Sequence, residues 1–208
     1  MSNLRVVSHP VLQDALARLR DKNTKPSDFR RLMGDAGLLL GLAALEDLKL
    51  ATAKVTTPMT STKVQVLGQP VALVAILRAG LGLLPKLSEL LPDAATGHIG
   101  LYRNEETLNP IRYYVRLPKG IRQSRVLLCD PMLATGGSAA EAIRILKTDG
   151  AKDITLLSLL ATKTGIQKVH KEHPSVKIVT AAVDPVLNKI GYIVPGLGDA
   201  GDRIFGTL

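Results

Sequence analysis

Four short apolar runs, each rich in Val, Ile and Leu, constrain the fold of this chain more than any other feature. They are VALVAIL from Val71, RVLLCD from Arg125, DITLLSLLA from Asp153 and VKIVTAAV from Val176. Runs without polar alternation are typical of strands that are buried on both faces of a parallel sheet. Helical stretches lie between them, and this alternation predicts a doubly wound, mainly parallel α/β fold with right-handed crossovers.

The chain of 208 residues is long enough for one domain with a substantial core. It contains no internal repeat, low-complexity tract or long linker that would divide it. We therefore expect a single domain over residues 1–208, with a helical extension at 1–50 and the core sheet at 71–185. Two segments rich in turn residues, 101–118 and 191–208, break the strand and helix alternation. We expect them to form a small hood that covers a site.

A long helix is expected within the N-terminal extension. Ser27 has a side chain suited to capping a helix, and apolar spacing continues from Pro26 to about Leu48. The expected apolar stripe consists of Leu32, Ala36, Leu39, Ala43 and Leu50. The glycines at 34, 37 and 41 weaken this helix, since each costs about 1 kcal/mol relative to alanine. We therefore predict close packing of this helix against another helix or a second subunit.

The net charge of +9 and the pI near 9.8 indicate an anionic partner. Only six aromatic residues are present and none is Trp, which does not favour a binder of single-stranded nucleic acid. A small polyphosphate accounts for the charge equally well. No apolar run approaches the roughly 18 residues of a membrane span, and the N-terminus lacks the pattern of a secretory signal. We expect a cytoplasmic protein with no membrane or nucleic-acid partner, and Cys129 as a buried, inert thiol.

The strongest local signal is the string VLLCDPMLATGGSAAEAIRIL, in which a buried strand leads through a small-residue loop into a helix. Backbone N–H groups of the loop and the helix N-terminus can bind a phosphate, and the glycine pair allows close approach. The residues that would form this cradle are Ala134, Thr135, Gly136, Gly137 and Ser138. Asp130, which precedes the loop, can accept hydrogen bonds from sugar hydroxyls. An acid beside a phosphate cradle indicates a ribose 5-phosphate, and the string matches neither a P-loop nor a dinucleotide fingerprint.

The segment DPMLATGGS resembles the phosphoribosyl diphosphate motif of type I phosphoribosyltransferases in its uracil-specific form. Pro131 stands where many relatives have a second acid. Three further segments look like signatures of the same family, and together they cover nearly the whole chain: ILRAGLG from Ile76, GLYRNEETLNP from Gly100 and GYIVPGLGDAGDRIFGT from Gly191.

This resemblance implies a uracil phosphoribosyltransferase, a pentosyltransferase of UMP salvage that converts uracil and phosphoribosyl diphosphate (PRPP) to UMP and diphosphate. It implies Mg²⁺ that arrives with PRPP and is held mainly by substrate oxygens and water, without a set of protein metal ligands. It also implies GTP as a candidate allosteric activator. The glycines of the predicted N-terminal helix separately suggest a homodimer or homotetramer.

Site residues follow from the resemblance, position by position. Arg78 and Arg103 would bind the diphosphate, Asp130 the ribose, and Asp199 would face the ribose, the diphosphate and the base nitrogen. We expect catalysis to depend on Arg78, Asp130 and Asp199. The full PRPP set would be Arg78, Arg103, Asp130, Pro131, Met132, Leu133, Ala134, Thr135, Gly136, Gly137, Ser138 and Asp199. Uracil would be bound by Ile193, Gly198, Asp199 and Ala200, largely through the backbone.

Three places depart from the family pattern. Thr162, Lys163 and Thr164 precede Gly165 where the family typically has Ala-Pro-Glu. Pro85 and Lys86 occupy a helix that usually carries Met, Asp and Gly positions, and the segment before Asp47 lacks the expected Thr or Arg. These departures bear on regulation and subunit packing more than on the reaction.

Two other functions remain compatible with the sequence. One is a regulator on the same fold that binds RNA and uses the nucleotide site as a sensor. The other is a phosphoribosyltransferase for a purine, for which Tyr192 is the nearby aromatic residue that would stack on the larger base.

Overall fold

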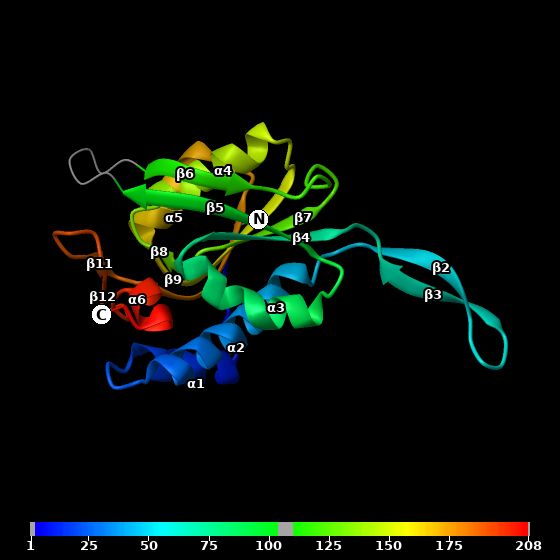
Figure 1. The fold of residues 1–208 in the computed structure, drawn as a ribbon, viewed down its shortest axis with the longest axis horizontal. Helices are drawn as coiled ribbons and strands as arrows, with labels where there is room; N and C mark the ends of the chain where they lie inside the picture. Colours follow the sequence, from blue (N-terminus) through cyan, green and yellow to red (C-terminus); the bar gives the residue numbers. More distant parts are fainter. Residues whose placement is uncertain (1–2, 104–109, 208) are drawn as a thin grey trace.

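A twisted, mainly parallel sheet forms the centre of the protein (Figure 1). The structure, a computed structural model, describes residues 3–103 and 110–207, apart from the side chains of residues 103 and 110. The strands of the main sheet are β1 (Leu4–Val6), β4 (Val71–Leu77), β5 (Ala95–Arg103), β6 (Pro110–Arg116), β7 (Arg125–Cys129), β8 (Met132–Leu133), β9 (Asp153–Thr162) and β10 (Lys177–Asp184). Their order is β1-β10-β9-β7-β4-β5-β6, with β8 beside β9.

The four apolar runs predicted as buried parallel strands are β4, β7, β9 and β10, and this prediction is confirmed. Strand β5 continues the parallel set, whereas β6 pairs with it in the antiparallel direction. Strands β1, β5 and β6 were not predicted as strands. Much of β5 and β6 is polar or exposed, so neither strand has the uniform apolar pattern that marks the centre of the sheet.

Helices cover both faces of the sheet. On one face lie α1 (Pro10–Arg20), α2 (Pro26–Leu45), the 3-10 helix η1 (Ala79–Leu83) and α3 (Leu84–Leu90). On the other lie α4 (Gly137–Thr148) and α5 (Lys163–Glu172). Alternate residues of β4 pack into the two cores, with Leu73 and Ala75 on the α2 side and Val74 and Ile76 on the α4 side. The doubly wound α/β fold is thereby confirmed.

Helix α2 was predicted, but its ends differ from the prediction. The N-cap is Lys25, without a side-chain capping bond, because Pro26 occupies the first turn and Ser27 already lies inside the helix. The helix ends at Leu45, and Leu50 instead begins a strand, where its side chain is exposed.

The close packing predicted from the glycines of α2 is confirmed. An added Cβ at Gly37 would lie 2.3 Å from the backbone oxygen of Leu83, and one at Gly41 would lie 2.2 Å from Cδ2 of Leu87. The backbone of α2 therefore contacts η1 and α3 directly. Gly37 meets rigid backbone, so this position requires a residue without a side chain, whereas Gly41 meets the end of the Leu87 side chain.

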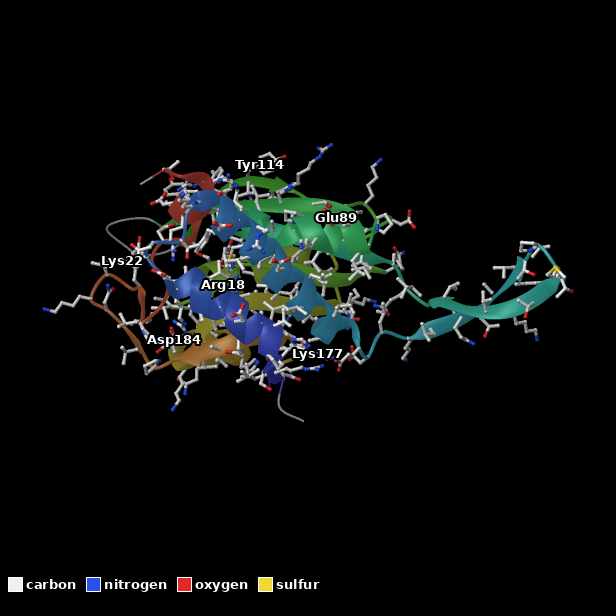
Figure 2. All side chains as sticks on the ribbon, turned by 90° about the horizontal axis from the view of Figure 1, so that it is seen from below. Arg18, Lys22, Glu89, Tyr114, Lys177 and Asp184 are labelled. Atoms are coloured by element: carbon white, nitrogen blue, oxygen red, sulfur yellow. The ribbon has the colours of Figure 1, made fainter. Side chains whose placement is uncertain are left out.

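Two smaller hairpins leave the main sheet. Strands β2 (Leu50–Thr56) and β3 (Ser61–Leu67) form an arm that projects from the body with side chains exposed along both faces (Figure 2). Strands β11 (Val186–Leu187) and β12 (Ile193–Val194) form the second hairpin, followed by α6 (Ala200–Phe205). We did not predict α6, because a helix of six residues among glycines shows no helical periodicity. It packs beside α2 and η1.

Candidate active site

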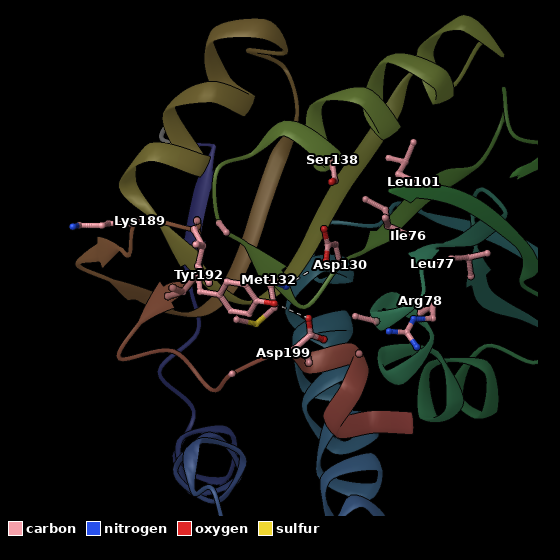
Figure 3. Close-up of a pocket in the computed structure, with 18 residues that line it drawn as sticks. Ile76, Leu77, Arg78, Leu101, Asp130, Met132, Ser138, Lys189, Tyr192 and Asp199 are labelled. Carbon is pink, nitrogen blue, oxygen red and sulfur yellow. Dashed lines mark hydrogen bonds between the residues drawn. The ribbon is translucent and has the colours of Figure 1, made fainter. Parts of the chain in front are cut away.

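A pocket of about 850 Å³ opens at the carboxyl ends of β4 and β7 (Figure 3). This is the edge at which open parallel sheets bind ligands. Its wall combines four parts of the chain: the end of β4 with the residues after it, Leu101 of β5, the loop after β7 with the start of α4, and the C-terminal segment from Lys189 to Gly201. The volume lies within the range of sites for small molecules and cofactors.

The loop after β7, which the sequence predicts to be a phosphate cradle, leads into α4 through two glycines. Gly136 is the N-cap of α4 with φ of 82°, in the left-handed region, and Gly137 begins the helix. An added Cβ at Gly136 would lie 2.8 Å from the backbone oxygen of Gly165. Of the residues predicted to bind PRPP in this loop, Met132, Ala134 and Ser138 line the pocket. The backbone turn and the helix N-terminus can therefore receive an anion.

Not every residue of the predicted PRPP set reaches the pocket wall. Pro131, Thr135, Gly136 and Gly137 are absent from the lining, and Leu133 is 1% exposed and belongs to the core. These five residues therefore contribute to the conformation of the loop backbone, and not side chains to the pocket wall.

Asp130 lies at the floor of the pocket, directly after β7 (Figure 3). The backbone N–H of Met132 donates to its Oδ1 at 3.3 Å. Burial raises the pKa of Asp130 to about 7, against the smaller lowering effect of the Met132 N–H. Near neutral pH this carboxyl is therefore poised between its two protonation states. Cys129, as expected, is buried, and burial raises the pKa of its thiol to about 12.

Arg78 follows β4 and lies on the opposite wall of the pocket, where it contacts α6. Its Nη2 donates to Oδ1 of Asp202 at 3.0 Å, and its guanidinium carbon is 5.9 Å from the centre of the Phe205 ring. The Thr207 hydroxyl and then Arg78 lower the pKa of Asp202. The side chain is about half exposed, so the guanidinium is accessible to a ligand in the pocket.

The turn after Arg78 packs tightly against the neighbouring strand. An added Cβ at Gly80 would lie 2.3 Å from the backbone oxygen of Cys129, at the end of β7. A glycine is therefore required for η1 to begin where it does, and this turn places Arg78 and Asp130 at the same pocket.

The predicted uracil residues Ile193, Gly198, Asp199 and Ala200 all line the pocket. Asp199 is the N-cap of α6, and its Oδ1 accepts from the backbone N–H of Asp202 at 2.9 Å. The hydroxyl of Tyr192 donates to Oδ2 of Asp199 at 3.2 Å. Gly198 has φ of 82°, in the left-handed region. The C-terminal stretch of residues 189–201, called the base segment after its predicted role, is therefore a loop that ends in a capped helix.

Sequence reasoning missed the residues that hold this loop from behind. Arg20 donates to both carboxylate oxygens of Asp184, at 2.6 and 2.8 Å, and to the backbone oxygen of Gly196 at 2.8 Å. The N–H of Gly196 donates to Asp184 at 2.9 Å. Arg203 donates to the backbone oxygen of Leu197 at 2.8 Å, and its guanidinium is 4.2 Å from the centre of the Phe29 ring. Arg20 and Asp184 are 164 residues apart, so no local motif signals the pair.

The predicted clamp residue Arg103 is the last residue of β5. Its side chain lies outside the described part of the chain, so its role remains a prediction. Within residues 3–103 and 110–207, no group of three or more His, Cys, Asp or Glu side chains could hold a metal ion. In the same ranges no helix has the length and apolar character needed to cross a membrane.

Comparison with known proteins assigns the fold and the family. A family model described as uracil phosphoribosyltransferase matches residues 6–207. Proteins named uracil phosphoribosyltransferase from Thermus thermophilus and Clostridium botulinum strain Hall are each 50% identical to the chain. The first alignment covers 98% of this chain and 99% of its relative, and the second covers 100% of both.

Among solved structures, the AQ2163 protein from Aquifex aeolicus superposes with a TM-score of 0.93 at 33% identity, over 97% of each chain. Adenine phosphoribosyltransferase from Trypanosoma brucei, at 16% identity, has a TM-score of 0.59 over 88% of this chain and 84% of that one, and shares the fold. The mainly parallel sheet, with the loop of residues 130–136 before α4, is the architecture of a type I phosphoribosyltransferase. We call this loop the phosphate loop after its predicted role. The chain belongs to the uracil phosphoribosyltransferase family.

Proposed function

We propose that this protein transfers the phosphoribosyl group of PRPP to uracil, giving UMP and diphosphate in pyrimidine salvage. The observation that carries the proposal is a single pocket that joins the loop before α4 to the C-terminal segment predicted to bind uracil. Both segments lie in a chain that matches the family over residues 6–207.

The phosphate loop and the two walls of the pocket suggest how PRPP is held. The backbone N–H groups of residues 135–138 would bind the 5′-phosphate at the start of α4, whereas the N–H of Ala134 donates to the backbone oxygen of Met132 at 3.0 Å. Asp130 would accept hydrogen bonds from the ribose hydroxyls in its ionised form. Arg78 would exchange part of its contact with Asp202 for a contact with the diphosphate, whose negative charge grows as it departs. Arg103, outside the described side chains, would add a second cation over the same group.

The C-terminal segment supports recognition of the base. Backbone groups of Ile193, Gly198 and Ala200 would pair with the donors and acceptors of uracil. Asp199 would face the base nitrogen and assist removal of its proton, with its carboxylate held in place by Tyr192 and the first turn of α6.

The reaction needs no nucleophilic side chain, because the base nitrogen displaces diphosphate at the anomeric carbon. The protein contributes orientation of two substrates and stabilisation of the leaving group. The pocket offers the separate carboxylates of Asp130 and Asp199, which fits a Mg²⁺ ion held mainly by substrate oxygens and water. When bound, Mg²⁺ would neutralise charge on the diphosphate.

Three finer proposals accompany the reaction. We propose that the protein acts in the cytoplasm and that it forms a homodimer or homotetramer, for which the exposed apolar side chains of the β2–β3 arm, such as Met59, would supply contact area. We also propose GTP as an allosteric activator. Sedimentation velocity with and without GTP, combined with initial rates, tests the last two proposals.

Formation of UMP from radiolabelled uracil, PRPP and Mg²⁺ tests the reaction, with cytosine, hypoxanthine and orotate as parallel substrates. Turnover with uracil alone is expected. Turnover with hypoxanthine instead would reassign the base. Binding of UMP without turnover of any base would favour a nucleotide sensor on the same fold.

A further inference from the structure

The junction between β9 and α5 departs from the family pattern in sequence, and it lies directly against the phosphate loop. Thr162 ends β9, is the N-cap of α5 and is 1% exposed. Its hydroxyl accepts a hydrogen bond from the N–H of Gly165 at 3.0 Å and donates one to the backbone oxygen of Ala134 at 2.6 Å. One hydroxyl group therefore caps a helix and holds a peptide group of the phosphate loop.

Backbone contacts surround this hydrogen bond. An added Cβ at Gly165 would lie 2.6 Å from the oxygen of Ala134 and 2.7 Å from that of Leu133. One at Gly136 would lie 2.8 Å from the oxygen of Gly165. The first turn of α5 therefore packs directly against the backbone of the loop. Lys163 and Thr164, the other departures, are exposed, whereas the side chain of Thr162 is buried and donates to the loop.

The hydrogen bond to Ala134 sets the orientation of a whole peptide plane. In a trans peptide the C=O of one residue and the N–H of the next point in opposite directions. With the Ala134 carbonyl directed at Thr162, the N–H of Thr135 is directed away from α5. This N–H is one of the donors proposed for the 5′-phosphate, and Ala134 lines the pocket. Donors oriented before the ligand arrives bind it without a cost of reordering.

We infer that Thr162 is a positioning residue for the 5′-phosphate of PRPP, acting through the Ala134 carbonyl. The inference rests on the proposed function of the same pocket. It predicts that loss of the hydroxyl weakens PRPP without affecting uracil, whose predicted binding residues belong to a separate segment of the pocket wall, the one that carries Tyr192 and Asp199 (Figure 3).

Three variants of the full chain separate this role from general destabilisation. Thr162→Val removes the hydroxyl at nearly constant shape, and Thr162→Ser retains it. Thr155→Val is the matched control, since Thr155 is buried in the same strand and its hydroxyl has no hydrogen-bond partner among the described residues. Thr162→Ala removes the same hydroxyl and serves in place of the valine variant if that variant does not fold.

Initial rates give the Michaelis constants for PRPP and uracil, and calorimetry gives PRPP affinity without uracil. Thr162→Val is expected to raise the KM and Kd for PRPP about tenfold, the factor for about 1.4 kcal/mol, with the KM for uracil within about twofold of native. Thr162→Ser and Thr155→Val should remain close to native. The inference is overturned by an equal rise in both Michaelis constants, by native PRPP affinity without the hydroxyl, or by a serine variant as weak as valine.

Calorimetry also separates this inference from the proposed function. A native protein that binds PRPP but forms no UMP would refute the reaction, while the PRPP affinities of the variants would still decide the role of Thr162. A native protein that does not bind PRPP would overturn both.

Discussion

Arg20→Met removes the guanidinium that ties the end of α1 to the base segment and leaves much of the aliphatic stem. The native side chain makes two hydrogen bonds to Asp184 and one to the backbone oxygen of Gly196. Asp184 is only 6% exposed, whereas Arg20 is 25% exposed. Breaking a buried pair costs about 3–5 kcal/mol, and the partial exposure of Arg20 places the expected loss near the lower end, at ~3 kcal/mol.

The loss should depend on pH in a definite direction. Burial raises the pKa of Asp184, but hydrogen bonds from Arg20 and Gly196 lower it further, so the native pKa lies below its ordinary value. The native pair therefore contributes stability above the unfolded pKa and loses it as the pH falls through the folded pKa. Without Arg20, burial dominates and the folded pKa rises. The variant then loses most free energy of unfolding at neutral pH, and its difference in this free energy from the native protein becomes smaller in acid.

Urea unfolding at pH 7 and at about pH 4 measures this difference. Arg144→Met is the matched control, because Arg144 makes an equally short two-point contact with Glu141 but is 61% exposed. An exposed pair of this kind contributes about 0–1 kcal/mol. In kinetics, Arg20→Met should raise the KM for uracil more than that for PRPP. The reasoning would be refuted if Arg20→Met and Arg144→Met lost the same free energy of unfolding. It would also be refuted if the difference in this free energy between the native protein and Arg20→Met became larger in acid.

Three further predictions concern other parts of the molecule. Gly37→Ala should lower the free energy of unfolding, measured in urea, by about 1–3 kcal/mol, because its methyl would meet the backbone oxygen of Leu83. The control Gly34→Ala should raise it by about 0.5–1 kcal/mol, because its methyl meets only the Lys86 side chain at 3.5 Å or more. In the native protein the KM for PRPP should rise as the pH falls below about 7, since Asp130 gains a proton, and Asp130→Asn should abolish this dependence; an unchanged pH profile would contradict the role of Asp130. Asp199→Asn should lower kcat by about 10²-fold or more with little change in the Kd for PRPP, and a change confined to affinity would exclude Asp199 from proton transfer.

The centre of the fold could be predicted from sequence because its strands are buried on both faces. The run VALVAIL is apolar at every position, and six of its seven residues are buried in β4. The β2–β3 arm has no such pattern, since most of its side chains are exposed and its pairing is local. Helix α6 is too short for periodicity, and Asp199, its N-cap, is recognisable as a cap only once the helix is known.

The candidate site could be predicted to a similar degree. Arg78, Asp130 and Asp199 come from three distant segments, and the structure places all three at one pocket. Their supports could not be predicted, because they depend on tertiary contacts. The pairing of Arg20 with Asp184 spans 164 residues, and Thr162 donates a hydrogen bond to the carbonyl of Ala134, 28 residues away.

A crystal structure with UMP bound tests the central claim most directly, namely that the loop before α4 and the C-terminal segment form the two halves of one nucleotide site. We predict that the phosphate of UMP contacts the backbone N–H groups of residues 135–138, that its ribose hydroxyls contact Asp130, and that its uracil pairs with the backbone of Ile193, Gly198 and Ala200. UMP bound with its base away from residues 193–200, or with its phosphate outside the loop, would contradict the account.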